Sequence, residues 1–591
     1  MEWRYRGNGF RRCAAVRAAA RPDGGAGTLT APPRQQAEPS PGSSEWFSPV
    51  EAPLVVDPAE AAWHAEADAL VVGVGGAGIC AALDLNERGM SVIAIDRFDG
   101  GGATGISGGI YYGGGTHHQK EAGYEETADN MFRYLRHELR GAVSDETIRK
   151  FAEDSNANLE WLEQHGVRFG SKCFEPKTPY PPDDYNLYYS GNEKADGARK
   201  VARPVPRGHR VVGPGFTGSA LWGALRYSLE KSDVTYVTQA AVRRLVVDAD
   251  GAVVGLEALI LPPRIARLHG AVMRWFSASI LRMTGGPVAR LLARALDALE
   301  RRHGERKLYR AHHGVILACG GFVHNRKMAL HYAPHQGCSL PMGTLSCDGS
   351  GIRLGQSVGG AVRAINNFDL SRSITPPAYL AGIIVNAEGK RFIAEDAYNA
   401  TIGHAVALDQ KGKAWIIADA QQRRAARSQL QWPTHLVMFL WQLRNILSMT
   451  FGTRRSGSLD KLAHKLGIPA DALQATVEQY RAIVAAGSDP LGKAPENIKP
   501  FGAGPYYAID IGSHCRVNPT TGFSLGGLDV SEQTGQVLDR AGAPVPGLFA
   551  AGRSAYGVPS NFYVSGLAIA DCVFSGRRAA ASIASGRQPR P

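Results

Sequence analysis

The feature that most constrains the fold is a strand–loop–helix–strand pattern at residues 68–96, which reads DALVVGVGGAGICAALDLNERGMSVIAID. The apolar run at 69–72 predicts a buried strand, the segment at 79–88 has the apolar spacing of a helix, and the apolar run at 92–95 predicts a second strand. A loop of the form Gly-x-Gly-x-x-Gly joins the first strand to the helix. These parts in this order are typical of a site that binds a dinucleotide.

Each glycine of the loop has its own physical role. Gly73 permits the tight turn, Gly75 lets backbone N–H groups approach a pyrophosphate, and Gly78 lets the helix pack close to the strand. The helix N-terminus then faces the phosphates with its partial positive charge. Asp96, at the end of the second strand, can accept hydrogen bonds from ribose hydroxyls and disfavours a 2′-phosphate, so FAD or NAD fits better than NADP. The alternative is a glycine-rich turn in a sheet that binds no nucleotide.

Length, charge and cysteine usage limit the remaining possibilities. A chain of 591 residues is too long for one hydrophobic core, so two or three domains are expected. The net charge of +12 comes largely from local stretches, and we expect no nucleic-acid partner. No run of 18 apolar residues predicts a membrane-spanning helix. The eight cysteines lack metal-ligand spacing and are interpreted as reduced thiols of a cytoplasmic protein with no metal site.

Residues 1–66 are predicted to form an extension that precedes the dinucleotide-binding domain. They are rich in Arg, Ala, Pro, Gly and Ser, and Glu2 is the only acid in the first 21 residues. No apolar stretch in this region has the length of a secretory signal core. We therefore expect a basic, disordered extension, or sequence translated upstream of the true start, with a transit-like arm as the alternative.

A second glycine-rich loop follows Asp96. Nine glycines lie between Gly100 and Gly115, a density that excludes a helix interior or an ordinary strand. Such a loop needs a ligand or close backbone packing to become ordered. Thr104 and Ser107 are placed in it to donate hydroxyl hydrogen bonds.

These motifs together resemble a flavoprotein superfamily. A GxGxxG loop, a ribose acid and a glycine-rich ATxxSGG loop at 103–109 are similar to those of fumarate reductase, succinate dehydrogenase and the 3-ketosteroid dehydrogenases. The resemblance covers residues 67–586 apart from an insertion at 261–312. Members with covalent flavin carry a histidine in this loop, and residues 103–109 contain none, so the resemblance implies non-covalent FAD.

The resemblance also implies the fold class and the domains. We expect an α/β protein with a Rossmann-like FAD-binding domain, split into N- and C-terminal parts, and an inserted α+β substrate or capping domain. The first part of the FAD-binding domain is placed at 67–362, interrupted by the insertion at 261–312. The capping domain is placed at 363–506, and the second part of the FAD-binding domain at 507–591.

Further motifs extend the implied FAD site. The strand ending in ACGGF at 318–322, the SCDG segment at 346–349 and the strand GLFAAGR at 547–553 each resemble a flavin-binding segment of the family, and a helix is expected to begin near Gly566. The implied FAD contacts are Gly73, Gly75, Gly76, Ala77, Gly78, Asp96, Arg97, Ala103, Thr104, Ser107, Gly108, Gly109, Val242, Ala318, Gly320, Gly321, Asn325, Asp348, Gly552, Arg553, Gly566 and Leu567.

The insertion at 261–312 contains eleven Arg or Lys residues and three acids. Its apolar residues interleave with arginines at helical spacing, and they are Ile265, Leu268, Val272, Trp275, Phe276 and Ile280. A basic amphipathic helix of this kind can lie on an anionic membrane. A surface helix packed on its own domain, or on a dimer partner, explains the pattern equally well. A strand is expected to resume at His313.

Two short segments distinguish the reaction types of the superfamily. Fumarate reductases hold two carboxylates with guanidinium groups and histidine, whereas this chain reads EDAYN at 395–399 and NFYVSG at 561–566. A tyrosine after ED together with a YxSG loop most resembles the 3-ketosteroid Δ4-(5α)-dehydrogenases. The Δ1-dehydrogenases are also similar, but their loop has a tyrosine followed by proline and glycine, which is missing here.

This resemblance implies an FAD-dependent oxidoreductase that desaturates the C4–C5 bond of a 3-oxo-5α-steroid. Tyr563 is expected to donate to the C3 carbonyl and to stabilise the enolate, and Ser565, relayed by Tyr398, to take the C4 proton, while a hydride leaves to flavin N5. Serine and tyrosine are poor bases at their ordinary pKa values, so the relay needs assistance. Each residue has a simpler interpretation as a packing or helix-capping residue.

Two other functions remain open at this point. A flavin reductase of a small unsaturated acid requires an arginine near the flavin. A non-catalytic flavoprotein could instead use the basic helices for peripheral membrane contact, and this contact is also compatible with the dehydrogenase. The electron acceptor and the oligomeric state do not follow from the sequence.

Overall fold

The computed structural model describes residues 50–586, except 177, 280–285, 335–338, 431–435 and 516, together with the backbone but not the side chains of 436–441. The predicted extension therefore lies outside the described residues as far as residue 49. From residue 50 onward that prediction is wrong, because β1 (Leu54–Val55) pairs in parallel with β9 and Ala65 already begins β2.

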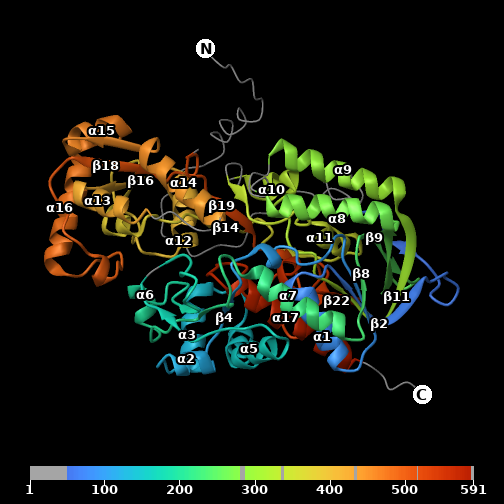
Figure 1. The fold of residues 1–591 in the computed structure, drawn as a ribbon. Coiled ribbons are helices and arrows are strands. Elements are labelled where there is room, and N and C mark those ends of the chain that lie inside the picture. The colour runs from blue at the N-terminus through green and yellow to red at the C-terminus, as the bar shows by residue number, and fades with distance from the viewer. Residues whose placement is uncertain are drawn as a thin grey trace, which may run out of the picture.

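The main sheet joins segments from both ends of the chain (Figure 1). Its order is β1-β9-β10-β11-β2-β3-β8, with β22 on β11 and β21 on β22. The pairs among β2, β3, β8, β11 and β22 are parallel, whereas β9 and β10 form an antiparallel hairpin. The strands after β1 are β2 (Ala65–Val72), β3 (Val92–Ile95), β8 (Thr235–Val237), β9 (Ala240–Val247), β10 (Val253–Ile260), β11 (Glu305–Leu317), β21 (Gln536–Leu538) and β22 (Pro544–Ala550).

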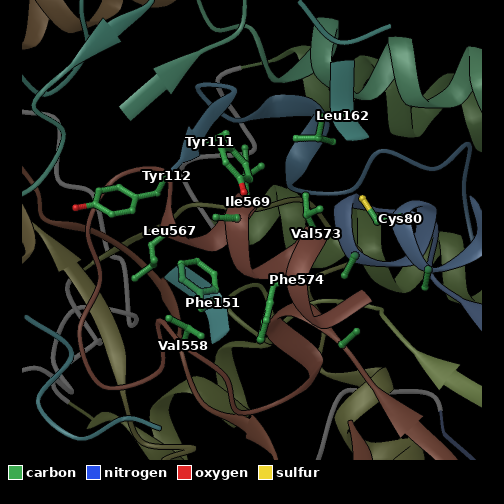
Figure 2. Close-up of a cluster of buried hydrophobic side chains, with 14 of the residues drawn as sticks. Cys80, Tyr111, Tyr112, Phe151, Leu162, Val558, Leu567, Ile569, Val573 and Phe574 are labelled. Atoms are coloured by element: carbon green, nitrogen blue, oxygen red, sulfur yellow. The ribbon is translucent and has the colours of Figure 1, made fainter. Parts of the chain in front are cut away.

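Helices α1 (Gly76–Glu87), α7 (Gly218–Lys231) and α17 (Leu567–Ser585) group along the main sheet (Figure 1). Nearly every residue of α1 is buried, as expected of a helix that is apolar on all sides. In Figure 2, α17 contributes Leu567, Ile569, Val573 and Phe574 to a core that also holds Tyr111 and Phe151. This layered arrangement confirms the predicted α/β class, and β22 gives the sheet its C-terminal strand.

A second region lies between β3 and β8 in the chain. It contains α2 (His117–Glu121), α3 (Ala128–Leu139), α4 (Asp145–Glu153), α5 (Ser155–Gln164) and α6 (Asp196–Arg199). Its sheet has the order β4-β7-β6-β5, formed by Ile110–Tyr112, Gly208–Arg210, Leu187–Tyr188 and Cys173–Phe174. Because its strands have only two or three residues each, the alternation of apolar and polar residues gives little signal for this sheet.

The capping domain has its own antiparallel sheet of order β15-β16-β18-β17, formed by Ile383–Asn386, Ala414–Ala418, Tyr506–Asp510 and Thr453–Ser456. Its helices are α12 (Asn399–His404), α13 (Ala420–Ser428), α14 (Leu436–Thr450), α15 (Leu459–Leu466) and α16 (Ala470–Ala486). The predicted boundary at residue 506 is too early, because β18 pairs with both β16 and β17. A smaller sheet, β12-β19-β14, consists of Leu340–Pro341, Thr521–Ser524 and Phe368–Ser371.

The insertion folds as two helices, α8 (Pro263–Ala278) and α9 (Pro287–His303), between β10 and β11 (Figure 1). The strand resumes at Glu305 and not at His313 as predicted, because residues 305–310 pair with β10. Charged side chains in this part of β11 are matched by acids on neighbouring segments, since Arg306 pairs with Glu51 and Glu257. The pairing explains why a charge-rich segment forms a strand.

One carboxylate, that of Glu300 on α9, joins the insertion to the main sheet. It accepts hydrogen bonds from Arg97 at 2.7 and 3.1 Å, from Arg243 at 2.7 Å, and from His269 on α8 at 2.9 Å when that nitrogen carries a proton. An apolar cluster beside it contains Phe276 of α8. Burial would raise the pKa of Glu300, but Arg97, His269 and Arg243 lower it to about 2. The interpretation that the insertion packs on its own domain is therefore correct for the buried face of α8.

Replacing this carboxylate should loosen the helix pair. Because the pKa of Glu300 is lower in the folded protein, its stabilisation is present above about pH 4.5 and is lost as the pH falls toward 2. For Glu300→Gln we expect a loss of about 3 kcal/mol in local stability at neutral pH. Amide hydrogen exchange in α8 and α9 measures this opening directly. Glu305→Gln is the control, because that side chain is exposed; equal exchange in both variants would contradict the assignment.

Candidate active site

A groove opens near the N-terminus of α1, where β2, β3, β11 and β22 end and β9 begins. Thirteen of the predicted FAD contacts line it: Gly73, Gly75, Gly76, Ala77, Asp96, Arg97, Ala103, Thr104, Val242, Ala318, Gly320, Gly552 and Arg553. The sequence reasoning missed their neighbours Val72, Ile95, Gly102, Ala240, Ala241, Arg243, Cys319, Ser346, Cys347, Ser350, Leu354, Ala551 and Cys572, which line the same groove. For most of these, adjacency to a predicted residue was the available signal.

The glycines of the first loop fit a bound pyrophosphate. A Cβ on Gly73 would meet the Ala318 carbonyl oxygen at 2.8 Å, and one on Gly78 would collide with the Gly73 carbonyl oxygen. A Cβ on Gly75 has the Gly101 carbonyl oxygen, 3.8 Å away, as its nearest neighbour, so this glycine leaves the groove open. Helix α1 has no acid in its first turn. Its N-terminus therefore presents backbone donors and positive potential toward the groove.

Asp96 and Arg97 stand side by side at the end of β3 but have different partners. The Asp96 carboxylate accepts the backbone N–H groups of Val74 and Phe98 at 2.7 and 2.8 Å, and burial raises its pKa. A carboxylate has about four lone-pair sites, so Asp96 can also accept a ribose hydroxyl. The Arg97 guanidinium is held by Glu300 and by Asp348, the latter at 2.8 Å.

The other predicted FAD contacts do not line the groove, and several have structural roles. A side chain on Gly321 would collide with Ser524, Asn325 caps α10 (Arg326–Tyr332), and Asp348 pairs with Arg97. The Ser107 hydroxyl donates to the Thr104 carbonyl. The remaining predicted contacts that do not line the groove are Gly78, Gly108, Gly109, Gly566 and Leu567. Their contact with FAD stays a prediction.

The three predicted catalytic residues come together from distant parts of the chain. The ring centroids of Tyr398 and Tyr563 are 6.4 Å apart at 60°, and Tyr398 is hydrogen-bonded to Ser565. Tyr398 precedes α12 of the capping domain, whereas Tyr563 and Ser565 lie in the loop before α17. Burial raises the pKa of both phenols, so both are neutral at physiological pH.

Two residues of this cluster were missed by sequence reasoning. The Tyr188 hydroxyl, on β6, donates to Ser565 Oγ at 3.3 Å. Asp369, on β14, is buried, and its charge raises the pKa of Tyr563 and Tyr398. The available signal for Asp369 was a single acid within the apolar strand FDL, whereas the pair of tyrosines at 188 and 189 gave none.

The arrangement limits the chemistry of this cluster. It offers hydroxyl groups that can donate to a carbonyl oxygen and pass a proton between them. Arg553, which lines the groove, lies over the ring of Phe523, with 5.3 Å between the guanidinium carbon and the ring centroid. Phe523 in turn contacts Tyr563, at 5.1 Å between ring centroids. These ring contacts connect the groove to the hydroxyl cluster.

Comparisons with known proteins identify the family to which the chain belongs. The pattern of the family described as FAD binding domain matches residues 68–566. The chain is 38% identical over 511 residues to the 3-oxo-5-alpha-steroid 4-dehydrogenase of Comamonas testosteroni, which covers 83% of this chain and 93% of the relative. It is 27% identical over 564 residues to the 3-oxosteroid 1-dehydrogenase of Mycobacterium tuberculosis, with 84% and 94% covered.

The fold is also similar to a solved structure. The crystal structure of the 3-ketosteroid-delta4-(5alpha)-dehydrogenase of Rhodococcus jostii in complex with 4-androstene-3,17-dione matches with a TM-score of 0.76 at 30% identity, covering 91% of this chain and all of that chain. The resemblance stated from the motifs is thereby confirmed. Because the family pattern spans most of the chain, the protein belongs to the FAD-binding flavoprotein family and FAD is its cofactor.

Proposed function

We propose that this protein is an FAD-dependent 3-ketosteroid dehydrogenase that introduces the C4–C5 double bond into a 3-oxo-5α-steroid. The observation that carries the proposal is the contact of Tyr398, Tyr563 and Ser565 in one cluster, in which Tyr398 is buried and the other two are half-buried. The relative that is 38% identical is named for this reaction, and the similar crystal structure holds a 4-ene-3-ketosteroid.

Each residue of the cluster has its own role in the reaction, which follows from the hydrogen bonds it can make. The Tyr563 phenol is neutral and donates to the C3 carbonyl, which stabilises the enolate oxygen as it develops. Ser565 Oγ takes the C4 proton and is joined by hydrogen bonds to Tyr188 and Tyr398, which can pass a proton onward. When bound, FAD accepts the hydride that leaves C5.

The cluster argues against a reductase of small dicarboxylates. Such a substrate carries two negative charges and needs cations beside it. Here the cluster offers the neutral hydroxyl groups of Tyr398, Tyr563 and Ser565, and the charged neighbours of Tyr563 include Asp369 and Arg553, the latter lying over the Phe523 ring. Neutral donors suit a neutral ketone, whereas a fumarate-like acid needs a cation for each of its carboxylates.

We propose that the groove residues hold FAD without a covalent bond. Gly75 and the N-terminus of α1 would bind the pyrophosphate, and Asp96 the ribose. The glycine-rich loop at 103–109 contains no nucleophilic histidine. Tight binding then depends on hydrogen bonds and on packing within the groove.

We also propose that the insertion makes peripheral contact with an anionic membrane. Among the residues that the structure describes, no helix is long and apolar enough to cross a bilayer. The outer face of α8 and α9 carries Trp275 and Leu291, which are 57 and 70% exposed. The described exposed residues of both helices include no acid, and they comprise Pro263, Arg264, Arg267, Leu268, Ala271, Arg274, Trp275, Ala278, Pro287, Val288, Arg290, Leu291, Arg294, Ala295, Ala298, Arg301, Arg302 and His303.

The composition of this face matches an interfacial helix pair. Arginines are attracted to anionic lipids, and tryptophan and leucine can enter the headgroup region. A steroid partitions into lipid, so a dehydrogenase held at the membrane surface would meet its substrate there. Packing against a second copy of the chain is the competing interpretation.

Flavin reduction by a steroid tests the central proposal. Under anaerobic conditions, 5α-androstane-3,17-dione should bleach the flavin absorbance and yield a 4-ene product. Tyr563→Phe should slow bleaching by about 10²–10³-fold and Ser565→Ala by about 10²–10⁴-fold. Tyr227→Phe is the control, because that ring is exposed. Unchanged rates in both active-site variants would remove the assignment, and a 1-ene product would indicate the Δ1 reaction.

Cofactor release tests the FAD assignment. After denaturation and filtration, FAD should appear quantitatively in the filtrate, because no covalent bond retains it. Asp96→Asn should weaken FAD binding by about 10–100-fold, since a hydrogen bond to a charged group is lost. Asp250→Asn, in the exposed β9–β10 turn, should bind FAD as the wild type does. Flavin that stays with the precipitate would contradict the non-covalent prediction.

Vesicle binding tests the membrane contact. The protein should sediment with vesicles of phosphatidylglycerol and phosphatidylcholine and not with phosphatidylcholine alone. Replacing Arg264 and Arg267 together by Gln should weaken binding by about 30-fold, at about 1 kcal/mol per arginine. Replacing Arg133 and Arg136 of α3 should have little effect, because these pair with acids nearby. A stable dimer without vesicle binding would favour the competing interpretation.

A further inference from the structure

Asp369 is a buried acid without a hydrogen-bond partner for one of its oxygens. It lies in the middle of β14 and is 3% exposed, and its Oδ1 has no partner within the described part of the chain. An unpaired buried carboxylate is costly, so such a group is retained only where its environment or function requires it. The proposed mechanism above assigns it no role.

The strand register places this acid at the ketone site. Asp369 is opposite Phe523 of β19 in an antiparallel pair, so the two side chains are on the same face of the sheet. The Phe523 ring contacts the Tyr563 ring in an edge-on arrangement, with centroids 5.1 Å apart. The carboxyl group therefore lies near the phenol that is assigned to the substrate carbonyl.

The charged groups around it leave the acid without a counterion. Tyr563, before α17, and Tyr398, before α12, are the phenols whose pKa values its charge raises. Arg372, which follows β14, donates to the Asn518 and Gly512 carbonyls and to Thr520. Arg553, after β22, lies over the ring of Phe523. Neither arginine forms an ion pair with Asp369 among the described residues, and burial alone raises the pKa of Asp369 to about 8.

We propose that Asp369 is a positioning residue that acts through Tyr563, and that it is held as a neutral carboxylic acid while the enolate forms. This inference rests on the proposed dehydrogenase function. A neutral acid in an apolar site can donate a hydrogen bond, whereas a carboxylate in the same place repels a developing oxyanion. Ionisation of Asp369 would therefore oppose the charge that Tyr563 has to stabilise.

A role as the base that takes the C4 proton predicts the opposite behaviour. A base has to be ionised, so activity would rise with pH as Asp369 loses its proton, and a neutral isostere would abolish it. For a neutral positioning acid, activity falls as the pH rises through the pKa of Asp369, and the neutral isostere retains activity. Asp369→Asn separates the two, because asparagine has nearly the shape of the protonated acid.

The experiment measures flavin reduction by saturating 5α-androstane-3,17-dione in the holoenzyme from about pH 6 to about pH 10. In the wild type the rate should fall above about pH 8, tending toward tenfold for each further pH unit. Asp369→Asn should stay within about threefold of the wild type near pH 7 and should lack this fall. Asp529→Asn is the matched control, because burial also raises the pKa of that acid but it pairs with Arg363 outside the cluster.

Two results with the Asp369→Asn variant would overturn the inference: loss of most of its activity at neutral pH, or persistence of the alkaline fall. An infrared titration of the holoenzyme gives a readout without substrate. A carboxylic C=O band should disappear near pH 8 in the wild type and be missing from Asp369→Asn, and a wild type without this band at neutral pH also overturns the inference. If the steroid does not reduce the wild-type flavin, the proposed function fails, and the infrared result alone decides the protonation state.

Discussion

Close packing among α1 and the ends of β2, β11 and β22 is the constraint on which the rest of the structure depends. The loop after β2 touches the chain after β11 at Gly73, and α1 touches that loop at Gly78, in both cases without room for a Cβ. Gly552, after β22, is equally close to α1, since a Cβ there would meet the Ala77 Cβ at 2.8 Å. The segments around residues 73, 318 and 552 therefore lie together at one helix N-terminus. The groove exists because these contacts are made by glycine.

This constraint explains which parts of the fold follow from sequence. Glycine spacing and apolar runs are local signals, so α1, its flanking strands and the groove near Gly75 could be predicted from them. The cap boundary could not, because β18 belongs to the cap through pairing with β16, about ninety residues earlier in the chain. The start of β11 was missed for a similar reason. Its charged residues suggest a loop until the acids that pair with them, such as Glu51, are known.

The insertion shows how a distant segment can support the groove that is proposed to bind FAD. Arg97 and Arg243 line the groove, and both are held by Glu300 from α9. Sequence reasoning placed Arg97 beside the cofactor but could not assign its partner, which is more than two hundred residues away. A buried carboxylate with several cationic partners is difficult to replace, because loss of one member leaves the others unpaired. The helix pair therefore supports the nucleotide site with its inner face and leaves its basic outer face available.

The groups at the proposed ketone site act as neutral hydrogen-bond donors and not as fixed charges. Tyr563, Tyr398 and Tyr188 are kept protonated by burial, and the same burial favours the neutral form of Asp369. A neutral site suits a substrate that is itself neutral and gains negative charge only as the α C–H bond breaks, because donors then interact more strongly with the transition state than with the bound ketone. A site of fixed cations would bind anions tightly before any reaction began. If Asp369 acts in its protonated form, as proposed, the pH range of the enzyme and its choice of a neutral ketone would have the same physical origin.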